Sequence, residues 1–136
     1  MTQEIPKVSQ YMTKAPEYIN SEANIYEAME LMQKKDIRHL PVEKEKKIIG
    51  LISERDIKTL FALVGANFKT VKVGDVCAEW PYIAHPDTPI NVVAADMATQ
   101  KLGSALILDN GKLIGIFTAT DACRALSEIF VNELKN

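Results

Sequence analysis

Two short stretches of the chain carry the residue types that could do chemistry, and they share one pattern. Residues 50–56 read GLISERD and residues 115–121 read GIFTATD: a glycine, apolar residues, a hydroxyl and then an aspartate three residues later. Each reads as a strand that ends at the hydroxyl and leads into a helix. A helix N-terminus offers free N–H groups and a positive dipole end to a phosphate. Carboxylate oxygens one turn further can accept the two hydroxyls of a ribose. The pattern therefore suits a nucleotide grip.

The same spacing has a purely structural interpretation. Residues 53–56 and 118–121 both fit the S/T-x-x-D capping box, in which the hydroxyl caps a helix and the acid reaches back to the cap residue. Spacing alone does not separate the two interpretations, and one residue can serve both.

The repeated pattern belongs to a duplication that extends along nearly the whole chain. Residues 8–64 align with residues 73–129 at a constant offset of 65, without a gap. Apolar residues at positions 25, 28, 29 and 32 align with apolar residues at 90, 93, 94 and 97. Both sets have the i, i+3, i+4, i+7 spacing of one buried helix face. The internal repeat predicts two copies of one structural unit.

Each repeat reads as β-α-β-β-α. In the first repeat we expect a strand at 18–19, a helix at 24–35, a strand at 37–42, a turn at 43–47, a strand at 48–53 and a helix at 54–64. In the second, Asp109-Asn110-Gly111 is a tight-hairpin signal. Thr88 is expected as a helix N-cap with Pro89 at the first helical position. The last helix is expected at 119–134.

The predicted fold is of the α+β (α/β) class, with the two repeats related by pseudo-twofold symmetry. We place repeat 1 at residues 8–64, a linker at 65–72 and repeat 2 at 73–130. Because halves of about 60 residues would each be marginally stable alone, we expect them to share one core.

Composition excludes several classes of protein. The 136 residues carry a net charge of −2, which gives no general attraction to nucleic acid or to an anionic membrane. The N-terminus is polar, and no apolar run approaches the about 18 residues of a membrane span. We therefore expect a cytoplasmic protein without a signal peptide. Cys77 and Cys123 lack metal or redox spacing, and Cys123 is expected to be a buried thiol.

Several local motifs resemble one known family. Residues 12–13 (MT), 40–42 (LPV), 49–52 (IGLI) and 53–57 (SERDI) are typical of its bacterial members. With the duplicated β-α-β-β-α pattern, they make residues 8–130 resemble a tandem pair of CBS domains, named for cystathionine β-synthase, of the stand-alone bacterial or archaeal type.

The resemblance implies a regulatory binding module rather than an enzyme. CBS pairs bind AMP, ADP, ATP, S-adenosylmethionine or NAD in clefts between their two repeats. Asp56 and Asp121 would then hold ribose, and Ser53 and Thr118 would face the phosphate. The segments that enter the first strand of each repeat would flank adenine; their candidate residues are Met12, Ala15, Pro16, Glu17 and Tyr18, and Cys77, Trp80, Pro81, Tyr82 and Ile83. The family habit of pairing segments from opposite repeats predicts that Asp121 works with residues 12–18 and Asp56 with residues 77–83.

The two repeats differ at the phosphate side. Arg38-His39 resembles, in reversed order, the phosphate-contacting basic pair of AMP-activated protein kinase gamma subunits, but the second repeat has Gly103-Ser104 there. Arg55 likewise becomes Thr120. We therefore expect one good nucleotide cleft per chain and one poor or empty cleft.

Two other functions compete with the sensor. No nucleophile–base pair, metal set or P-loop occurs in the sequence, so we expect no enzyme activity and no catalytic cofactor. A ligand-free dimerisation or docking module is the main alternative, and nucleic-acid binding is disfavoured by the net charge. The family habit is a disc-like homodimer that acts on a client protein, and the broad apolar face of the last helix agrees with a homodimer.

Overall fold

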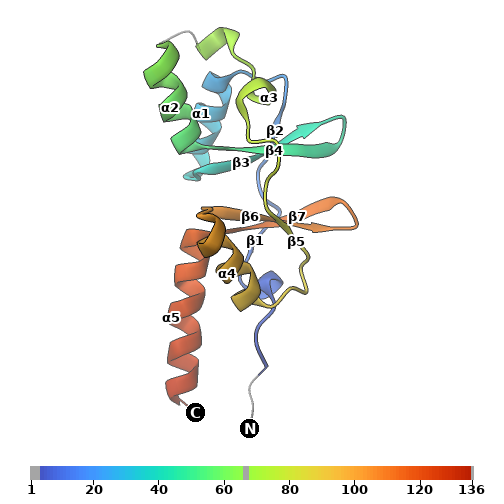
Figure 1. Ribbon diagram of the computed structural model, residues 1–136, viewed down its shortest axis with the longest axis vertical. Helices are drawn as coiled ribbons and strands as arrows, with labels where there is room; N and C mark the ends of the chain where they lie inside the picture. Colours follow the sequence, from blue (N-terminus) through green and yellow to red (C-terminus); the bar gives the residue numbers. More distant parts are fainter. Residues whose placement is uncertain (1–3, 66–67, 136) are drawn as a thin grey trace. The chain divides into compact units, whose positions relative to one another are not determined.

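The computed structural model describes residues 4–65 and 68–135, and it contains the β-α-β-β-α order twice (Figure 1). The first copy consists of β2 (Ile19–Asn20), α1 (Ile25–Lys35), β3 (His39–Lys44), β4 (Lys47–Ser53) and α2 (Glu54–Val64). The second consists of β5 (Ile83–Ala84), α4 (Ile90–Gln100), β6 (Ser104–Asp109), β7 (Lys112–Thr118) and α5 (Ala119–Lys135). Short elements precede each copy: η1 (Val8–Gln10) and β1 (Thr13–Lys14) before the first, η2 (Phe68–Thr70) and α3 (Val73–Val76) before the second. The predicted fold class is confirmed.

The compact units of the fold do not coincide with the two sequence repeats. Residues 17–81 form one unit, here called the middle unit, and residues 1–16 with 82–136 form the other, the end unit. Each unit has its own sheet and its own cluster of buried apolar side chains. Each cluster also contains a residue from the beginning of the other repeat: Val73 of repeat 2 in the middle unit and Val8 of repeat 1 in the end unit.

The middle unit is a three-stranded sheet with helices α1 and α2 beside each other (Figure 1). Strand β3 lies in its centre, parallel to β2 and antiparallel to β4. Its core residues are Ile19, Ile25, Ala28, Met32, Leu40, Val42, Ile52, Ile57, Val73 and Cys77. Val73, the first residue of repeat 2, is completely buried there.

The end unit is built in the same way, with the strand order β1-β7-β6-β5. Strand β1 pairs antiparallel with β7, which places Thr13 opposite Ile116. The core consists of Val8, Ala84, Ile90, Val93, Met97, Ala105, Ile107, Phe117 and Ala125. Val8 is completely buried and lies 65 positions before Val73, so the two repeats exchange equivalent segments.

The chain next to each exchanged segment also accepts a backbone hydrogen bond from the first turn of a helix. Ile25 N–H, at the start of α1, donates to the carbonyl of Val71 (3.1 Å), and Ile90 N–H, at the start of α4, donates to the carbonyl of Pro6 (2.8 Å). Each bond satisfies one of the backbone donors that a helix leaves open in its first turn. The described segments are thus held by backbone hydrogen bonds as well as by apolar burial.

The predicted N-cap of the second-repeat helix is wrong by one residue. Pro89, not Thr88, is the N-cap of α4, and it makes no side-chain cap. The backbone of Thr88 is used instead to hold η1, because its carbonyl accepts the N–H of Val8 (2.8 Å). The offset of 65 places Pro89 on Asn24, which is the capping residue of α1.

Both hairpins turn through two residues with positive φ. Asn110 (φ 51°) and Gly111 (φ 79°) form the predicted tight turn between β6 and β7. Glu45 (φ 51°) and Lys46 (φ 66°) form the same kind of turn between β3 and β4 without the residues that tolerate it best. The first hairpin therefore carries backbone strain that the second avoids.

One cysteine differs from expectation in its exposure. Cys123 is exposed on α5, so the prediction of a buried thiol is wrong, whereas Cys77 is buried. Cys123 lies beside the apolar face of α5 that packs on the sheet, and the helix turns its thiol to solvent. The Trp80 side chain is 93% exposed.

Candidate functional site

Both repeated motifs form capping boxes, as the structural interpretation predicts. Ser53 N–H donates to Asp56 Oδ2 (3.0 Å), and Asp56 N–H donates back to Ser53 Oγ (3.1 Å). Thr118 N–H donates to Asp121 Oδ2 (3.0 Å), and Asp121 N–H donates to Thr118 Oγ1 (3.2 Å). Each carboxylate is thereby fixed at the N-terminus of its helix, α2 or α5.

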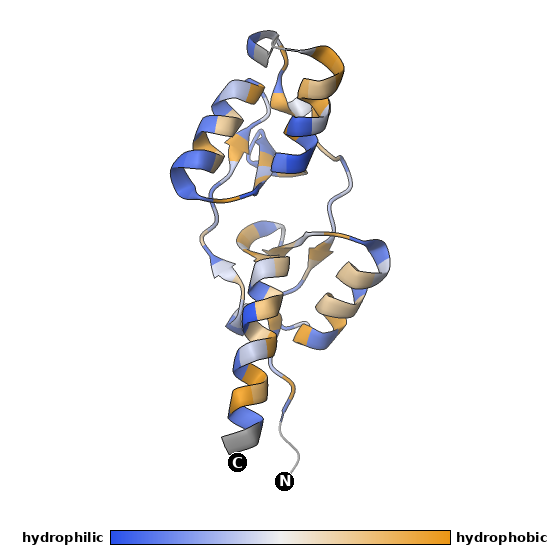
Figure 2. Ribbon diagram, turned by 90° about the vertical axis from the view of Figure 1, so that its left-hand side faces the viewer, coloured by the Kyte–Doolittle hydropathy of each residue, from blue (hydrophilic) through white to orange (hydrophobic). Residues whose placement is uncertain are grey.

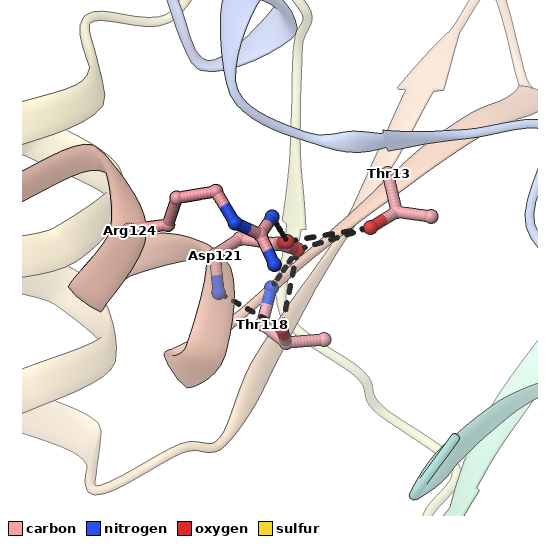
Figure 3. A network of polar contacts seen from close by, with 4 residues as sticks. All are labelled: Thr13, Thr118, Asp121 and Arg124. Atoms are coloured by element: carbon pink, nitrogen blue, oxygen red, sulfur yellow. Dashed lines mark hydrogen bonds and ion pairs between the residues drawn. The ribbon is translucent and has the colours of Figure 1, made fainter. Parts of the chain in front are cut away.

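In the end unit, three residues gather around the carboxylate of Asp121; we call Thr13, Thr118, Asp121 and Arg124 the end-unit grip (Figure 3). Asp121 is only 3% exposed. Its Oδ2 accepts the Thr118 N–H and the Thr118 hydroxyl (3.1 Å), and the Thr13 hydroxyl lies 3.3 Å from both carboxylate oxygens. Arg124 Nη1 donates to Oδ1 at 3.1 Å. The buried charge is thus paired and hydrogen-bonded.

The equivalent middle-unit grip consists of Ser53, Asp56, Thr59 and Ala78. The offset of 65 places Ala78 on Thr13 and Thr59 on Arg124, so neither side chain brings an equivalent donor. Asp56 is exposed, and in the described part of the chain only Ser53 donates to its carboxylate. One oxygen of Asp56 is therefore open where both oxygens of Asp121 are engaged.

A glycine starts each motif because another segment crosses directly over it. A Cβ on Gly50 would stand 2.7 Å from Cys77 Sγ and would also collide with the carbonyl oxygen of Ala78. That segment is bonded in place, because Leu51 and Ala78 exchange backbone hydrogen bonds of 3.0 and 2.8 Å. A Cβ on Gly115 would stand 2.9 Å from Met12 Cγ. Met12 and Cys77 are equivalent positions in the two repeats, so the same position of the repeat contacts the glycine in both units.

The crossings bring together part of each predicted residue set. Asp121 shares the end unit with residues 12–16, and Asp56 shares the middle unit with residues 77–81. Glu17 and Tyr18 belong to the middle unit, and Tyr82 and Ile83 to the end unit. Arg55 and Thr120 are exposed in the first turns of α2 and α5.

The predicted phosphate-side residues lie next to Ser53. His39 is paired opposite Ser53 in the sheet, and the carbonyl of Arg38 accepts the N–H of Glu54 (2.8 Å). Burial lowers the pKa of His39 below its ordinary value, and the neighbouring Asp56 carboxylate opposes that shift only in part. Arg38 is exposed, so it is the cation of the pair at neutral pH.

Polar contacts also fix the two segments that enter the first strands. The Tyr82 hydroxyl donates to Asp96 Oδ2 on α4 at 2.6 Å, and burial together with this bond raises the pKa of Tyr82 to about 12. In the middle unit, Glu17 pairs with Lys35 at the end of α1 (3.4 Å). The sequence did not reveal Asp96 or Arg124 as part of these arrangements, whereas Thr13 lies within the range 12–18 that was predicted to work with Asp121. For Arg124, a signal existed in its spacing of three residues from Asp121 on a helix.

Two kinds of feature are absent from the described residues. Within 4–65 and 68–135, no group of His, Cys, Asp and Glu side chains could hold a metal ion. No helix in the described part is both long and apolar enough to cross a membrane.

Comparison with known families identifies the class of protein. The family model of the CBS domain matches residues 8–62 and again residues 73–128. The chain therefore belongs to the CBS domain family and contains a pair of CBS repeats.

Similar structures include CBS pairs with adenosyl ligands. The CBS domain pair of protein MJ0100, in complex with 5′-methylthioadenosine and S-adenosyl-L-methionine, is 28% identical, with a TM-score of 0.83 over 92% of this chain and 98% of that chain. CBSX2 in complex with AMP is 26% identical, with a TM-score of 0.76 over 90% of this chain and 97% of that chain.

Curated relatives include enzymes that are much longer. Homoserine O-acetyltransferase of Methanohalobium evestigatum is 30% identical over 123 residues, which is 89% of this chain but 24% of the relative. The chain spans about a quarter of the length of the first two curated relatives it matches. The similarity thus concerns a CBS region within those proteins.

Proposed function

We propose that this CBS pair is a regulatory module that binds an adenosine-containing ligand and passes its occupancy to a partner protein. The candidate ligands are AMP, ADP, ATP, S-adenosylmethionine and NAD. The observation that carries the proposal is the repeated grip: a carboxylate fixed at a helix N-terminus, beside a glycine that is crossed by a segment from the beginning of the other repeat. Ligands of the similar MJ0100 and CBSX2 structures support the ligand class.

The residues take roles that follow from their chemistry. Asp56 and Asp121 accept ribose hydroxyls, since carboxylates are acceptors with several lone pairs. Ser53 and Thr118 stand at helix N-termini, where the dipole favours a phosphate. Arg38 supplies a positive charge on the same side as Ser53. The exposed indole of Trp80 is free to stack on a base.

A thermal-shift panel tests the proposed function. Wild type, Asp56→Ala and Asp121→Ala are heated with each candidate ligand at about 1 mM. A ligand at about 100 times its dissociation constant stabilises the folded state by roughly 2.7 kcal/mol, a shift of several degrees at this size. At least one ligand should stabilise wild type, and at least one aspartate variant should lose that shift. If ligand-free wild type responds to none of the ligands, the proposal fails.

A second candidate function is self-association through α5, and it is compatible with the first. Leu126 and Phe130 are each 60% exposed and Val131 is 46% exposed, while Ala125 of the same helix is buried against the sheet. Figure 2 shows apolar residues along the half of α5 nearest the C-terminus. A second copy of the chain is the occupant we propose, because a twofold contact lets one stripe cover its own equivalent.

Light scattering on a sizing column tests this contact. Wild type should elute as a dimer, and Leu126→Glu/Phe130→Glu should elute as a monomer, because a carboxylate in an apolar contact is costly to bury. Glu128→Gln, also exposed on α5, is the matched control and should remain dimeric. A monomeric wild type at about 0.1 mM would reject the second copy as the occupant.

A further inference from the structure

The two ribose acceptors are equivalent in sequence but not in their hydrogen bonds. The Asp121 carboxylate accepts hydrogen bonds from four donors: the N–H and hydroxyl of Thr118, the hydroxyl of Thr13 and the guanidinium of Arg124. A carboxylate offers about four lone-pair sites. Asp121 is therefore saturated by its own chain, and two incoming hydroxyls can bind only if two of these donors leave.

Two of the four donors can leave without disturbing the helix. The Thr118 N–H bond belongs to the capping box of α5, and the Thr118 hydroxyl, which also donates to Asp121, is held in place because it accepts the Asp121 N–H of the same box. Thr13 is exposed and shares its hydroxyl between both oxygens at 3.3 Å, and the Arg124 side chain is 58% exposed. Both therefore have water as an alternative partner. A ligand at Asp121 must compete with Thr13 and Arg124.

Asp56 faces no such competition. Within the described residues, only the Ser53 N–H donates to its carboxylate, and the side chain is exposed. Thr59 stands at the place of Arg124, three residues after the aspartate, and Ala78 stands at the place of Thr13. Neither side chain carries a charge, and alanine carries no donor.

We propose that Asp56 is the open ribose-diol acceptor of this chain and that Arg124, with Thr13, occupies Asp121 and sets the affinity of that second site. The inference rests on the proposed function and says which of its two grips fills first. Arg124 is a specificity-determining residue in this scheme. Ligands without ribose hydroxyls do not need the carboxylate, so Arg124 does not affect them.

The chain's own repeats supply the variants that test the proposal. Arg124→Thr/Thr13→Ala gives the end-unit grip the residues of the middle-unit grip. The reciprocal variant Thr59→Arg places a guanidinium three residues after Asp56, on an exposed position where it threatens no packing. Thr59→Met is its uncharged control of similar length. All are titrated calorimetrically with AMP and with 2′,3′-dideoxyadenosine 5′-monophosphate, and folding is checked by the thermal midpoint.

The affinity for AMP should rise when the end-unit grip is changed and fall when the middle-unit grip is changed. In an Asp56→Ala background, Arg124→Thr/Thr13→Ala should bind AMP about 3- to 30-fold more tightly than Asp56→Ala alone, the value of one ion pair with a largely exposed arginine plus one long hydroxyl–carboxylate hydrogen bond. In the wild-type background, Thr59→Arg should weaken the tighter AMP site about 2- to 5-fold, and Thr59→Met should not. The dideoxy ligand should bind all variants alike.

Three outcomes decide between the inference and the function on which it rests. Opposite changes in AMP affinity in the two grips, with no change in the affinity for the dideoxy ligand, support the inference. If wild type binds AMP but neither replacement changes its affinity, or Arg124→Thr/Thr13→Ala weakens it, the inference is overturned and the proposed function stands. If no protein, Thr59→Arg included, binds AMP, ADP, ATP, S-adenosylmethionine, NAD or 5′-methylthioadenosine at 1 mM, the proposed function fails and the inference fails with it.

Discussion

Met12 lies so close to Gly115 that a Cβ on the glycine would stand 2.9 Å from Met12 Cγ. Cys77 takes the equivalent position over Gly50 in the other unit, where the carbonyl of Ala78 also crosses the glycine. In each unit, the glycine that begins the motif is thus where the exchanged segment docks. The motif is at once a helix cap, a docking point and a candidate ribose grip.

Alanine at these glycines should destabilise the fold by different amounts. Gly50→Ala should cost about 1–3 kcal/mol, since the new methyl meets a backbone carbonyl that cannot move freely. Gly115→Ala should cost less, because Met12 is flexible and can move aside. Urea denaturation measures both changes.

A double-mutant cycle isolates the contact with Met12. Met12→Ala should remove most of the cost of Gly115→Ala, giving a coupling free energy of about 0.5–3 kcal/mol. It should not rescue Gly50→Ala, which lies in the other unit. Additive effects of Met12→Ala and Gly115→Ala would mean that the close approach carries no energy.

Local chemistry made some elements predictable from the sequence. The helix at 54–64 was predicted with the bounds it has, because Ser53 and Asp56 form a complete capping box and Gly65 follows. The hairpin at Asn110-Gly111 follows from backbone preference alone. The strand predicted at 37–42 instead runs from His39 to Lys44, since its ends are set by pairing with β4 rather than by its own residues.

Features that depend on partners distant in sequence were harder to predict. The burial of Val8 and Val73 in exchanged cores has no local signal, although the offset of 65 makes them equivalent. Pro89 was misplaced because a local Thr-Pro signal was preferred to its alignment with the capping residue Asn24. The contact between Arg124 and Asp121 is not predictable from the sequence alone, because a spacing of three residues on a helix allows such a pair but does not require it.

The strained hairpin offers a stabilising substitution. Glu45→Asn/Lys46→Gly gives the turn between β3 and β4 the residues of its partner turn, and both positions have positive φ. The free energy of unfolding should rise by up to about 1 kcal/mol. A non-glycine residue in the left-handed region costs roughly 1–2 kcal/mol, but glycine loses more conformational entropy on folding, which offsets part of the gain. The reverse change, Asn110→Glu/Gly111→Lys, is the matched control and should destabilise. A loss of stability in the first variant would show that Glu45 or Lys46 makes a compensating contact.

The two aspartates should differ in what they contribute to stability without ligand. Asp56→Ala should cost about 1 kcal/mol, the value of a helix cap. Asp121→Ala should cost more, because it also removes the acceptor of Thr13 and Arg124 from a site that is 3% exposed. Chemical denaturation of both variants, with Asp75→Ala as an exposed control, measures the difference. Equal losses for the two aspartates would contradict the contrast between the grips.

His39 should make stability depend on pH. Its folded-state pKa is lowered, chiefly by burial, so the unfolded chain takes up a proton first as the pH falls. The free energy of unfolding should therefore decline below the unfolded-state value of about 6.5. His39→Gln should remove this part of the slope, and His85→Gln, in an exposed loop of the end unit, should keep it. Denaturation series between pH 7.5 and 5.5 give the slopes, and an unchanged slope in His39→Gln would contradict the lowered pKa.

Ligand binding should raise the pKa of His39, whereas burial lowers it. An anion beside His39 favours its protonated form, so a phosphate bound next to Ser53 raises the pKa of His39 and binding takes up a proton. AMP should then bind more tightly as the pH falls from 7.5 to 6.0, before the phosphate itself loses most of its second charge. Adenosine should show no such dependence, and His39→Gln should remove the extra dependence seen with AMP. Calorimetric titrations in two buffers of different ionisation enthalpy count the protons taken up. If AMP binds wild type and His39→Gln with the same proton uptake, the phosphate does not lie beside His39, and Arg38 loses its proposed role with it.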